Sequence, residues 1–115
     1  MYSLEMKQVS KRYSSSKKQT TIALNNVDLT LTEGEFLGIM GTSGSGKTTL
    51  LNVASGIDRC DNGEICIGGI DISVMDKNEL SLFRRSNIGM VFQDFNLIIS
   101  LTIKENIMVP LILDQ

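Results

Sequence analysis

The most constraining feature of this chain is the segment from Gly41 to Thr48, in which glycines, a lysine and a threonine stand at fixed spacing. It matches the pattern G-x-x-x-x-G-K-[ST] at every fixed position. An unbroken apolar run, residues 36–40, comes directly before it, and a helical pattern follows from Lys47 to about Ala54. A buried strand, a glycine-rich loop and a helix in this order are the context that a phosphate-binding loop requires. We therefore predict such a loop here.

Each residue type in this loop suits a polyphosphate. Glycines let backbone N–H groups approach phosphate oxygens without a Cβ clash, and the helix that begins near Lys47 adds the positive end of its dipole. We expect Lys47 to contact the β- and γ-phosphates, the Thr48 hydroxyl to ligate Mg²⁺, and Thr49 to reach the α-phosphate. The predicted ATP-binding residues of this segment are Gly41, Thr42, Ser43, Gly44, Ser45, Gly46, Lys47, Thr48 and Thr49.

Strand patterns occur before and after the loop. Residues 27–31 alternate apolar and polar side chains, as in a strand with one face in water. Residues 36–40 and 88–92 are unbroken apolar runs, which are typical of strands buried on both faces in a parallel sheet. Two further strands are predicted at about residues 4–9 and at residues 64–67.

Two residue pairs, Asp76 with Glu79 and Thr102 with Glu105, have the spacing of a helix capping box. They predict a helix to about residue 85 and a final helix that Pro110 limits, with residues 93–101 between them as a loop. Alternating strands followed by strand–loop–helix units indicate an α/β domain with an antiparallel subsheet.

Composition excludes several kinds of site. The 115 residues contain no histidine, which removes Ser-His-Asp and Cys-His catalysis and His-ligated zinc within them. Cys60 and Cys66 are too few for a disulfide scaffold and match no zinc spacing, so we interpret them as reduced packing residues. The net charge of −2 argues against a nucleic-acid partner. No apolar run approaches the roughly 18 residues of a spanning helix, so a membrane role would require a partner.

Several segments together carry a family resemblance: Gly34-Glu35-Phe36, residues 40–52, Phe83-Arg84-Arg85, residues 88–97 and residues 101–107. Through them nearly the whole chain resembles the ATP-binding subunits of ABC transporters, and most of all the group for macrolide export, lipoprotein release and bacitracin-type peptide export. The glycine-rich loop marks only a superfamily, whereas the run around Gln93 is far more specific. The resemblance implies a partial P-loop NTPase core of the ABC ATPase type with an antiparallel β-subdomain.

The resemblance also implies roles for residues outside the loop. Tyr13 matches the aromatic residue that stacks on adenine, and Gln93 matches the Q-loop glutamine, which contacts Mg²⁺ and the attacking water. Lys47 and Gln93 would be catalytic, and Thr48 and Gln93 would hold the metal. Without the resemblance, Tyr13 also fits an edge-strand aromatic, and Gln93 fits a polar residue that ends a strand.

Partners follow from the same resemblance. Two subunits would form a homodimer around two Mg-ATP, on the cytoplasmic face of a transmembrane permease. Residues 95–107 would begin the surface that faces the permease. The expected function is that of the ATP-binding subunit of an exporter for an antibiotic, a peptide or a lipoprotein.

The hydrolytic motifs of the family do not occur within these residues, which hold no signature motif, no apolar run ending in Asp-Glu and no switch histidine. We therefore expect residues 1–115 to be the N-terminal part of a domain roughly twice as long, with hydrolysis only in the complete protein. Such a piece would lack the middle of its sheet and would be poorly soluble or loosely packed alone. Residues 111–115 superficially resemble a Walker B strand, and Asp94 resembles the aspartate that ends such a strand. The neighbouring sequence argues against both interpretations.

Two other functions remain open. The chain could form a non-hydrolysing nucleotide-binding or interaction module by itself. It could also be an unrelated small P-loop kinase or GTPase, which would need a metal-binding aspartate elsewhere. A GTPase would also need an Asn-Lys-x-Asp motif, and the chain has none.

Overall fold

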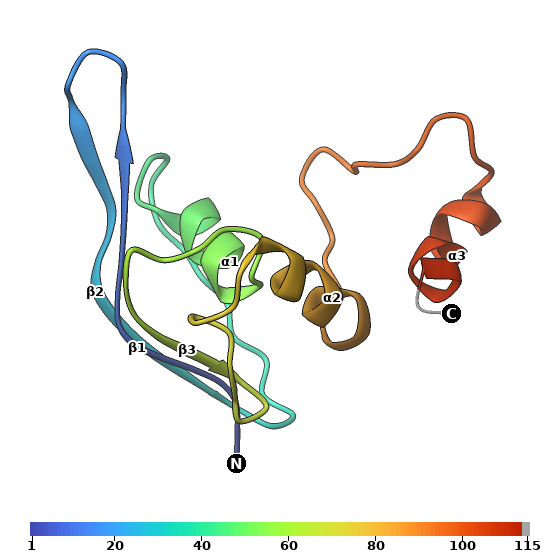
Figure 1. Cartoon of the computed structure of the whole chain (residues 1–115), viewed down its shortest axis with the longest axis horizontal. Coiled ribbons are helices and arrows are strands. Elements are labelled where there is room, and N and C mark those ends of the chain that lie inside the picture. The colour runs from blue at the N-terminus through green and yellow to red at the C-terminus, as the bar shows by residue number, and fades with distance from the viewer. Residues whose placement is uncertain (114–115) are drawn as a thin grey trace.

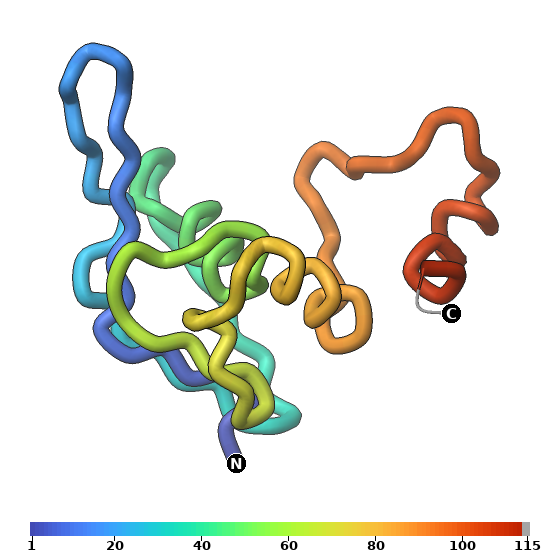
Figure 2. The backbone as a smooth tube through the Cα atoms, viewed as in Figure 1, coloured from blue at the N-terminus to red at the C-terminus, as the bar shows by residue number. Residues whose placement is uncertain are grey.

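A computed structural model describes residues 1–113. The elements in chain order are β1 (Tyr2–Ser14), β2 (Thr20–Thr32), α1 (Lys47–Ala54), β3 (Asn62–Ile67), β4 (Ile70–Asp71), α2 (Lys77–Asn87) and α3 (Ile103–Leu113). The four strands form one antiparallel sheet in the order β2-β1-β3-β4. Figure 1 shows α1 and α2 beside this sheet and α3 on the far side of α2. The chain between α2 and α3 forms an extended connection without regular secondary structure (Figure 2).

β1 and β2 form a long hairpin whose tip projects beyond the rest of the molecule (Figure 1). The two strands predicted at residues 4–9 and 27–31 are present but longer, because polar residues up to Ser14 and from Thr20 continue the pairing. The pairing shifts register between Met6 and Val9. The hairpin carries Tyr13 past the end of the β1–β3 pairing, which stops at Ser10.

The core lies between one face of the sheet and helices α1 and α2. Its buried apolar residues are Met6, Val9, Leu24, Val53, Ile65, Ile72, Leu80 and Phe83. Burying an aliphatic side chain of this kind contributes about 2 kcal/mol. Val53 is fully buried and belongs to α1, so the core holds the helix that follows the glycine-rich loop against the sheet.

The predicted helices are all present. The capping box of α2 has both hydrogen bonds: the Glu79 backbone N–H donates to Asp76 Oδ1 at 2.9 Å, and the Asp76 N–H donates to Glu79 Oε2 at 2.8 Å. The expected end at Pro110 is wrong, because α3 continues to Leu113 with Pro110 inside it. Proline lacks the N–H that would donate to the carbonyl four residues earlier and its ring crowds that carbonyl, but its φ is helical and the residues after it can stay helical.

The two strands predicted as buried are absent from the described residues. Residues 36–40 and 88–92 have no regular structure, and Phe36, Met40 and Val91 are 98%, 95% and 97% exposed. A strand needs a neighbour to satisfy its backbone groups, and no described strand pairs with either segment. The antiparallel sheet with its helices agrees with the predicted α/β class, whereas the parallel layer does not form within these residues.

Candidate nucleotide-binding site

Segments far apart in the chain surround one cavity of about 550 Å³. The hairpin, the glycine-rich loop, the first turn of α1 and the segment after residue 92 each contribute to its wall. Its lining residues are Tyr13, Thr21, Ile22, Ala23, Ser43, Gly44, Gly46, Lys47, Thr48, Thr49 and Gln93. The cavity therefore brings together most of the residues that the sequence predicted to contact ATP.

Backbone geometry explains the glycines of the loop. Gly44 and Gly46 have φ of 80° and 97°, a left-handed region that residues with a Cβ rarely adopt. Gly46 is also crowded, because a Cβ there would lie 2.5 Å from the carbonyl oxygen of Ala23 in β2. The loop can therefore pack directly against the hairpin only with glycine at this position.

The start of α1 has features that favour binding of an anion. Gly46 is the N-cap and makes no side-chain capping hydrogen bond, and the first turn carries no acidic residue. The N–H groups of a helix N-terminus and the positive end of its dipole attract negative charge. Thr48 and Thr49 of this first turn add hydroxyl groups at the cavity wall.

The Lys47 side chain curls back over its own loop. Its ammonium group donates to the carbonyl oxygens of Gly41 at 2.5 Å and Thr42 at 2.7 Å, and it lies 3.4 Å from Ser45 Oγ. The three predicted residues outside the cavity lining are thus the ones that hold Lys47. The contacts place a positive charge within the loop.

Tyr13 of the hairpin lines the same cavity and is 41% exposed. Its hydroxyl donates to Asp58 Oδ2 at 3.0 Å, and the Lys11 ammonium lies 5.3 Å from the ring centroid and 3.3 Å from Asp58 Oδ1. Partial burial of Asp58 favours its neutral form. The hydrogen bonds from Tyr13, the Arg59 N–H and Lys11 outweigh that effect and lower the pKa of the carboxyl.

Gln93 reaches the same cavity from a turn after the irregular segment 88–92. Phe95 and Asn96, two and three residues further on, have φ of 64° and 50°. The Phe95 N–H donates to the Phe92 carbonyl at 3.3 Å, and the Asn96 N–H donates to the Asp94 carbonyl at 2.7 Å. A tightly turned backbone therefore presents Gln93 at the cavity.

The residues of the cavity fit a magnesium ion bound together with phosphates. Mg²⁺ prefers oxygen ligands and is usually held by few protein groups plus substrate phosphates. The Thr48 hydroxyl and the Gln93 side-chain amide are groups of this kind, and both residues line the same cavity. Within residues 1–113, no group of three His, Cys, Asp or Glu residues is arranged to hold a metal without such a substrate.

A family model described as ABC transporter matches residues 24–115. The chain belongs to the ABC transporter ATP-binding family. The ABC transporter ATP-binding protein YvcR of Bacillus subtilis is 51% identical over 113 residues, which cover 97% of this chain and 44% of that protein. The bacitracin export ATP-binding protein BceA of Halalkalibacterium halodurans is 44% identical over 108 residues, covering 94% and 42%.

A solved structure of the same family has the same fold. The ATP-binding cassette MJ0796 of Methanocaldococcus jannaschii, in a dimeric post-hydrolysis state bound to ADP and Pi, superposes with a TM-score of 0.92 at 45% identity. The match covers 97% of this chain and 48% of that one. The chain thus spans less than half the length of these relatives, and its predicted fold class, a partial ABC ATPase core with an antiparallel β-subdomain, is confirmed.

The family's Walker B strand has no counterpart at residues 111–113, which form the end of α3 rather than a strand. This agrees with the rejection of that imitation. The last two residues of the run, Asp114 and Gln115, lie outside the described part of the chain. None of the helices in the described part is long and apolar enough to cross a membrane.

The sequence analysis did not predict several residues of the nucleotide-binding cavity. Thr21, Ile22 and Ala23 of β2 line the cavity, and Asp58 holds Tyr13 from the segment after α1. The β2 residues could have been found from the hairpin, because Tyr13 pairs with Thr21 across the strands. No sequence signal marks Asp58, since its contact depends on how α1 packs below the hairpin.

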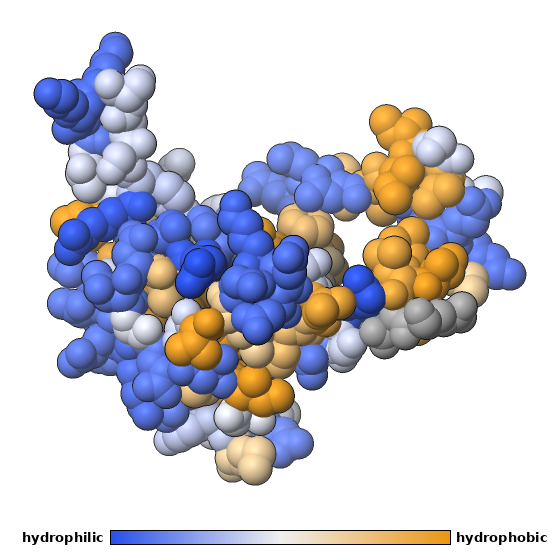
Figure 3. All heavy atoms as spheres, viewed as in Figure 1, coloured by the Kyte–Doolittle hydropathy of each residue, from blue (hydrophilic) through white to orange (hydrophobic). Residues whose placement is uncertain are grey.

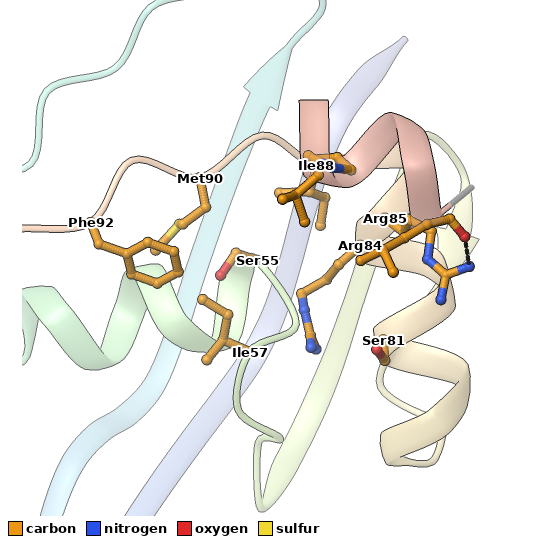
Figure 4. A pocket seen from close by; sticks show the side chains of 11 residues that line it. Ser55, Ile57, Ser81, Arg84, Arg85, Ile88, Met90 and Phe92 are labelled. Carbon is orange, nitrogen blue, oxygen red and sulfur yellow. Dashed lines mark hydrogen bonds between the residues drawn. The ribbon is translucent and has the colours of Figure 1, made fainter. Parts of the chain in front are cut away.

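A second cavity, of about 330 Å³, lies away from the nucleotide residues. Figure 4 shows it between the end of α1, helix α2, the segment 88–92 and α3. Arg84 of α2 donates to the Gly56 carbonyl at 2.6 Å, and Arg85 donates to the Leu113 carbonyl at 2.6 Å. These arginines join α2 to α1 and to α3. None of the residues predicted to bind ATP or a metal lines this cavity.

Proposed function

We propose that the protein binds ATP with Mg²⁺ in the cavity between the β1–β2 hairpin and the glycine-rich loop. One observation carries this proposal: Tyr13, the start of α1 and Gln93, which come from three distant parts of the chain, line the same cavity. Its volume of about 550 Å³ lies within the usual range for small-ligand sites. An aromatic ring and a helix N-terminus at the same cavity suit the base and the phosphates of a nucleoside triphosphate.

The phosphate side of the site works by charge. Lys47 would exchange its contacts with the Gly41 and Thr42 carbonyls for phosphate oxygens, which carry full negative charge. The loop N–H groups and the N-terminus of α1 would surround the remaining oxygens. Thr48 and Gln93 would hold Mg²⁺, which neutralises the phosphates when bound.

We propose further that residues 1–115 form the N-terminal part of an ABC ATP-binding domain, which comprises the β-subdomain, the phosphate loop, the Q-loop and the start of the helical subdomain. Hydrolysis would then require a signature motif, a Walker B aspartate and a catalytic glutamate outside these residues. Two subunits would sandwich two Mg-ATP. The dimeric structure of MJ0796 bound to ADP and Pi supports this arrangement.

The exposed segment before and within α3 would bind a transmembrane permease. Residues 97–107 expose several large apolar side chains, among them Leu97, Ile99, Ile103 and Ile107, at 64%, 99%, 82% and 71%. Figure 3 shows apolar atoms gathered over the α3 region. Permease binding would place the protein at the cytoplasmic face of a membrane. The resemblance to a bacitracin export protein supports export of an antibiotic or a peptide.

The nucleotide proposal is tested by calorimetric titration of Mg-ATP into the protein and its Lys47→Ala variant. Losing a charge-assisted contact to phosphate should weaken binding by about ten- to hundredfold. Lys77→Ala is the matched control, because Lys77 is exposed at the first turn of α2 and away from the cavity. Equal affinity in the Lys47→Ala variant and the wild type would refute the assignment.

Phosphate release from ATP separates the two functions that remain for this site. Binding with turnover that the Lys47→Ala variant abolishes supports the transport ATPase. Residues 1–115 alone should bind without turnover under either function, so only binding without turnover in the complete protein supports the non-hydrolysing nucleotide-binding module. The same assay with the permease present tests whether transport accompanies turnover, and in which direction.

The permease-facing surface has its own test. Ile99→Asp places a charge in the exposed apolar segment, and Val74→Asp does so at another exposed site before α2, where the native side chain is 76% exposed. We expect Ile99→Asp to weaken binding to the permease in reconstituted vesicles and Val74→Asp to leave it unchanged. Equal loss in both variants would contradict the placement of the surface.

A further inference from the structure

The tip of the hairpin has little support from the sheet. Pairing of β1 with β3 ends at Ser10, so the residues beyond it pair only with β2. Tyr13 lies in this unsupported part and exposes 41% of its surface. A side chain on such a hairpin needs other contacts to keep one orientation.

Those contacts come from a polar cluster made by Lys11, Tyr13 and Asp58. The Tyr13 hydroxyl donates to Asp58 Oδ2 at 3.0 Å, and Lys11 Nζ donates to Asp58 Oδ1 at 3.3 Å. The Lys11 ammonium also lies over the Tyr13 ring, 5.3 Å from its centroid, a cation–π contact. Each member of the cluster therefore touches both others.

The cluster is shielded from water at its Lys11 end and partly exposed at Tyr13 and Asp58. The Lys11 side chain is 12% exposed and the Asp58 side chain 37%. Shielding from water strengthens hydrogen bonds and charge pairs that are fully satisfied. The backbone N–H of Arg59 adds a further hydrogen bond to Asp58 Oδ1 at 2.9 Å. The orientation of the Asp58 carboxylate is thus fixed from several sides.

Asp58 is in turn attached to α1. Its backbone N–H donates to the Asn52 carbonyl at 3.1 Å, as does the N–H of Ile57 at 2.9 Å. Asn52 is one turn and a half along the helix that starts at Lys47. A continuous path of short contacts therefore connects the Tyr13 ring to the helix whose N-terminus faces the cavity.

We propose that Lys11 and Asp58 are positioning residues that hold the Tyr13 ring as the base-binding platform at a fixed place relative to the phosphate loop. The inference rests on the proposed function, in which Tyr13 contacts the base. Lys11 covers one face of the ring, so a base stacks on the other. The cluster acts on the base end of the ligand and leaves the phosphate end unaffected.

Calorimetric titrations with Mg-ATP and with magnesium tripolyphosphate, which has no base, test this proposal. Tyr13→Phe keeps the ring and removes only the hydroxyl, so it loosens the platform without unpairing a charge. Asp58→Ala removes the acceptor. Each should weaken Mg-ATP binding by roughly three- to tenfold and change tripolyphosphate binding by less than about twofold.

Additional variants separate positioning from a general effect on stability. The Tyr13→Phe/Asp58→Ala double variant should bind Mg-ATP no more weakly than Asp58→Ala alone, because both substitutions break the hydrogen bond between Tyr13 and Asp58. Asp58→Asn keeps an oxygen that can accept from Tyr13 and should recover most of the affinity. Asp28→Asn removes one exposed carboxylate elsewhere on the sheet and should leave the ratio of the two affinities unchanged.

Three results would overturn the proposal in distinguishable ways. If Tyr13→Ala weakens Mg-ATP binding while Tyr13→Phe and Asp58→Ala do not, the platform stands and the positioning role is wrong. If Tyr13→Ala has no effect either, the base contact of the proposed function fails as well. If Asp58→Ala weakens binding of Mg-ATP and of tripolyphosphate equally, the role of Asp58 is structural and not specific to the base.

Discussion

Gly46 and Ala23 are in close backbone contact, with 2.5 Å between the Ala23 carbonyl oxygen and the place where a Cβ on Gly46 would stand. This contact joins the phosphate loop to β2 of the hairpin. It places the loop beside the strand pair that carries Tyr13. The phosphate loop and the hairpin that carries Tyr13 are therefore in direct contact at this point.

Gly46→Ala should disrupt this junction. The new methyl group meets a backbone oxygen, and alanine must also adopt the φ of 97°. We expect a loss of about 2 kcal/mol or more in the free energy of unfolding, together with loss of Mg-ATP binding. Denaturant unfolding and titration measure both. Gly38→Ala is the control, since nothing lies within 4 Å of its Cβ position; equal losses in the two variants would contradict the account.

Asn106→Leu should loosen the loop before α3. The Asn106 side chain accepts from the Ile98 N–H at 2.8 Å and donates to the carbonyls of Ile98, Leu101 and Thr102. Leucine has a similar size and makes none of these bonds. We expect amide hydrogen exchange at Ile98 to accelerate by about tenfold. The exposed Asn78→Leu in α2 should leave that rate unchanged, and an unchanged rate in Asn106→Leu would disprove the anchoring role.

The contribution of Asp58 to stability should depend on pH. Its pKa is lower in the folded protein than the ordinary value of 3.8, because hydrogen bonds from Tyr13, Arg59 and Lys11 outweigh the opposite effect of burial. A lowered folded pKa gives stability that is present above pH 3.8 and is lost as the pH falls through the folded value. Wild type should therefore exceed Asp58→Asn in unfolding free energy by more at pH 6 than at pH 3. A pH-independent difference would argue against the charged contacts.

Cys66 should be a slow nucleophile. Burial, the hydrogen bond to Glu64 and nearby carboxylates raise the pKa of its thiol to about 11, so little thiolate exists at neutral pH. At pH 8, iodoacetamide should modify Cys66 about tenfold more slowly in the folded protein than in urea, measured by mass spectrometry of its peptide. Glu64→Gln should speed the reaction. The stability linked to this thiol is present below about pH 9 and is lost as the pH rises toward 11.

Local patterns predicted the elements whose causes are local. Helix α1 runs over Lys47–Ala54 as predicted, and the Asp76–Glu79 capping box starts α2, because a capping hydrogen bond spans only three residues. Residues 36–40 and 88–92 show the opposite case. Their apolar runs suit buried strands, but strand formation depends on neighbours, and no described residues supply them.

The residues of the candidate site also divide into those that a local pattern predicts and those that depend on distant parts of the chain. The spacing within residues 41–49 predicted the phosphate loop from chemistry alone. Tyr13 and Gln93 are 80 residues apart, so no local pattern could bring them together, and only the family resemblance did. Asp58 could not be predicted, because its contact with Tyr13 needs both the unsupported hairpin tip and the packing of α1.

The structure of the protein with Mg²⁺ and a non-hydrolysable ATP analogue would test the central claim most directly. We predict the base on the free face of Tyr13 and the phosphates across residues 43–49, with Lys47 moved from the Gly41 and Thr42 carbonyls to phosphate oxygens and Gln93 beside the metal. A nucleotide bound elsewhere, for example in the cavity between α2 and α3, or one that leaves Lys47 on those carbonyls, would contradict it.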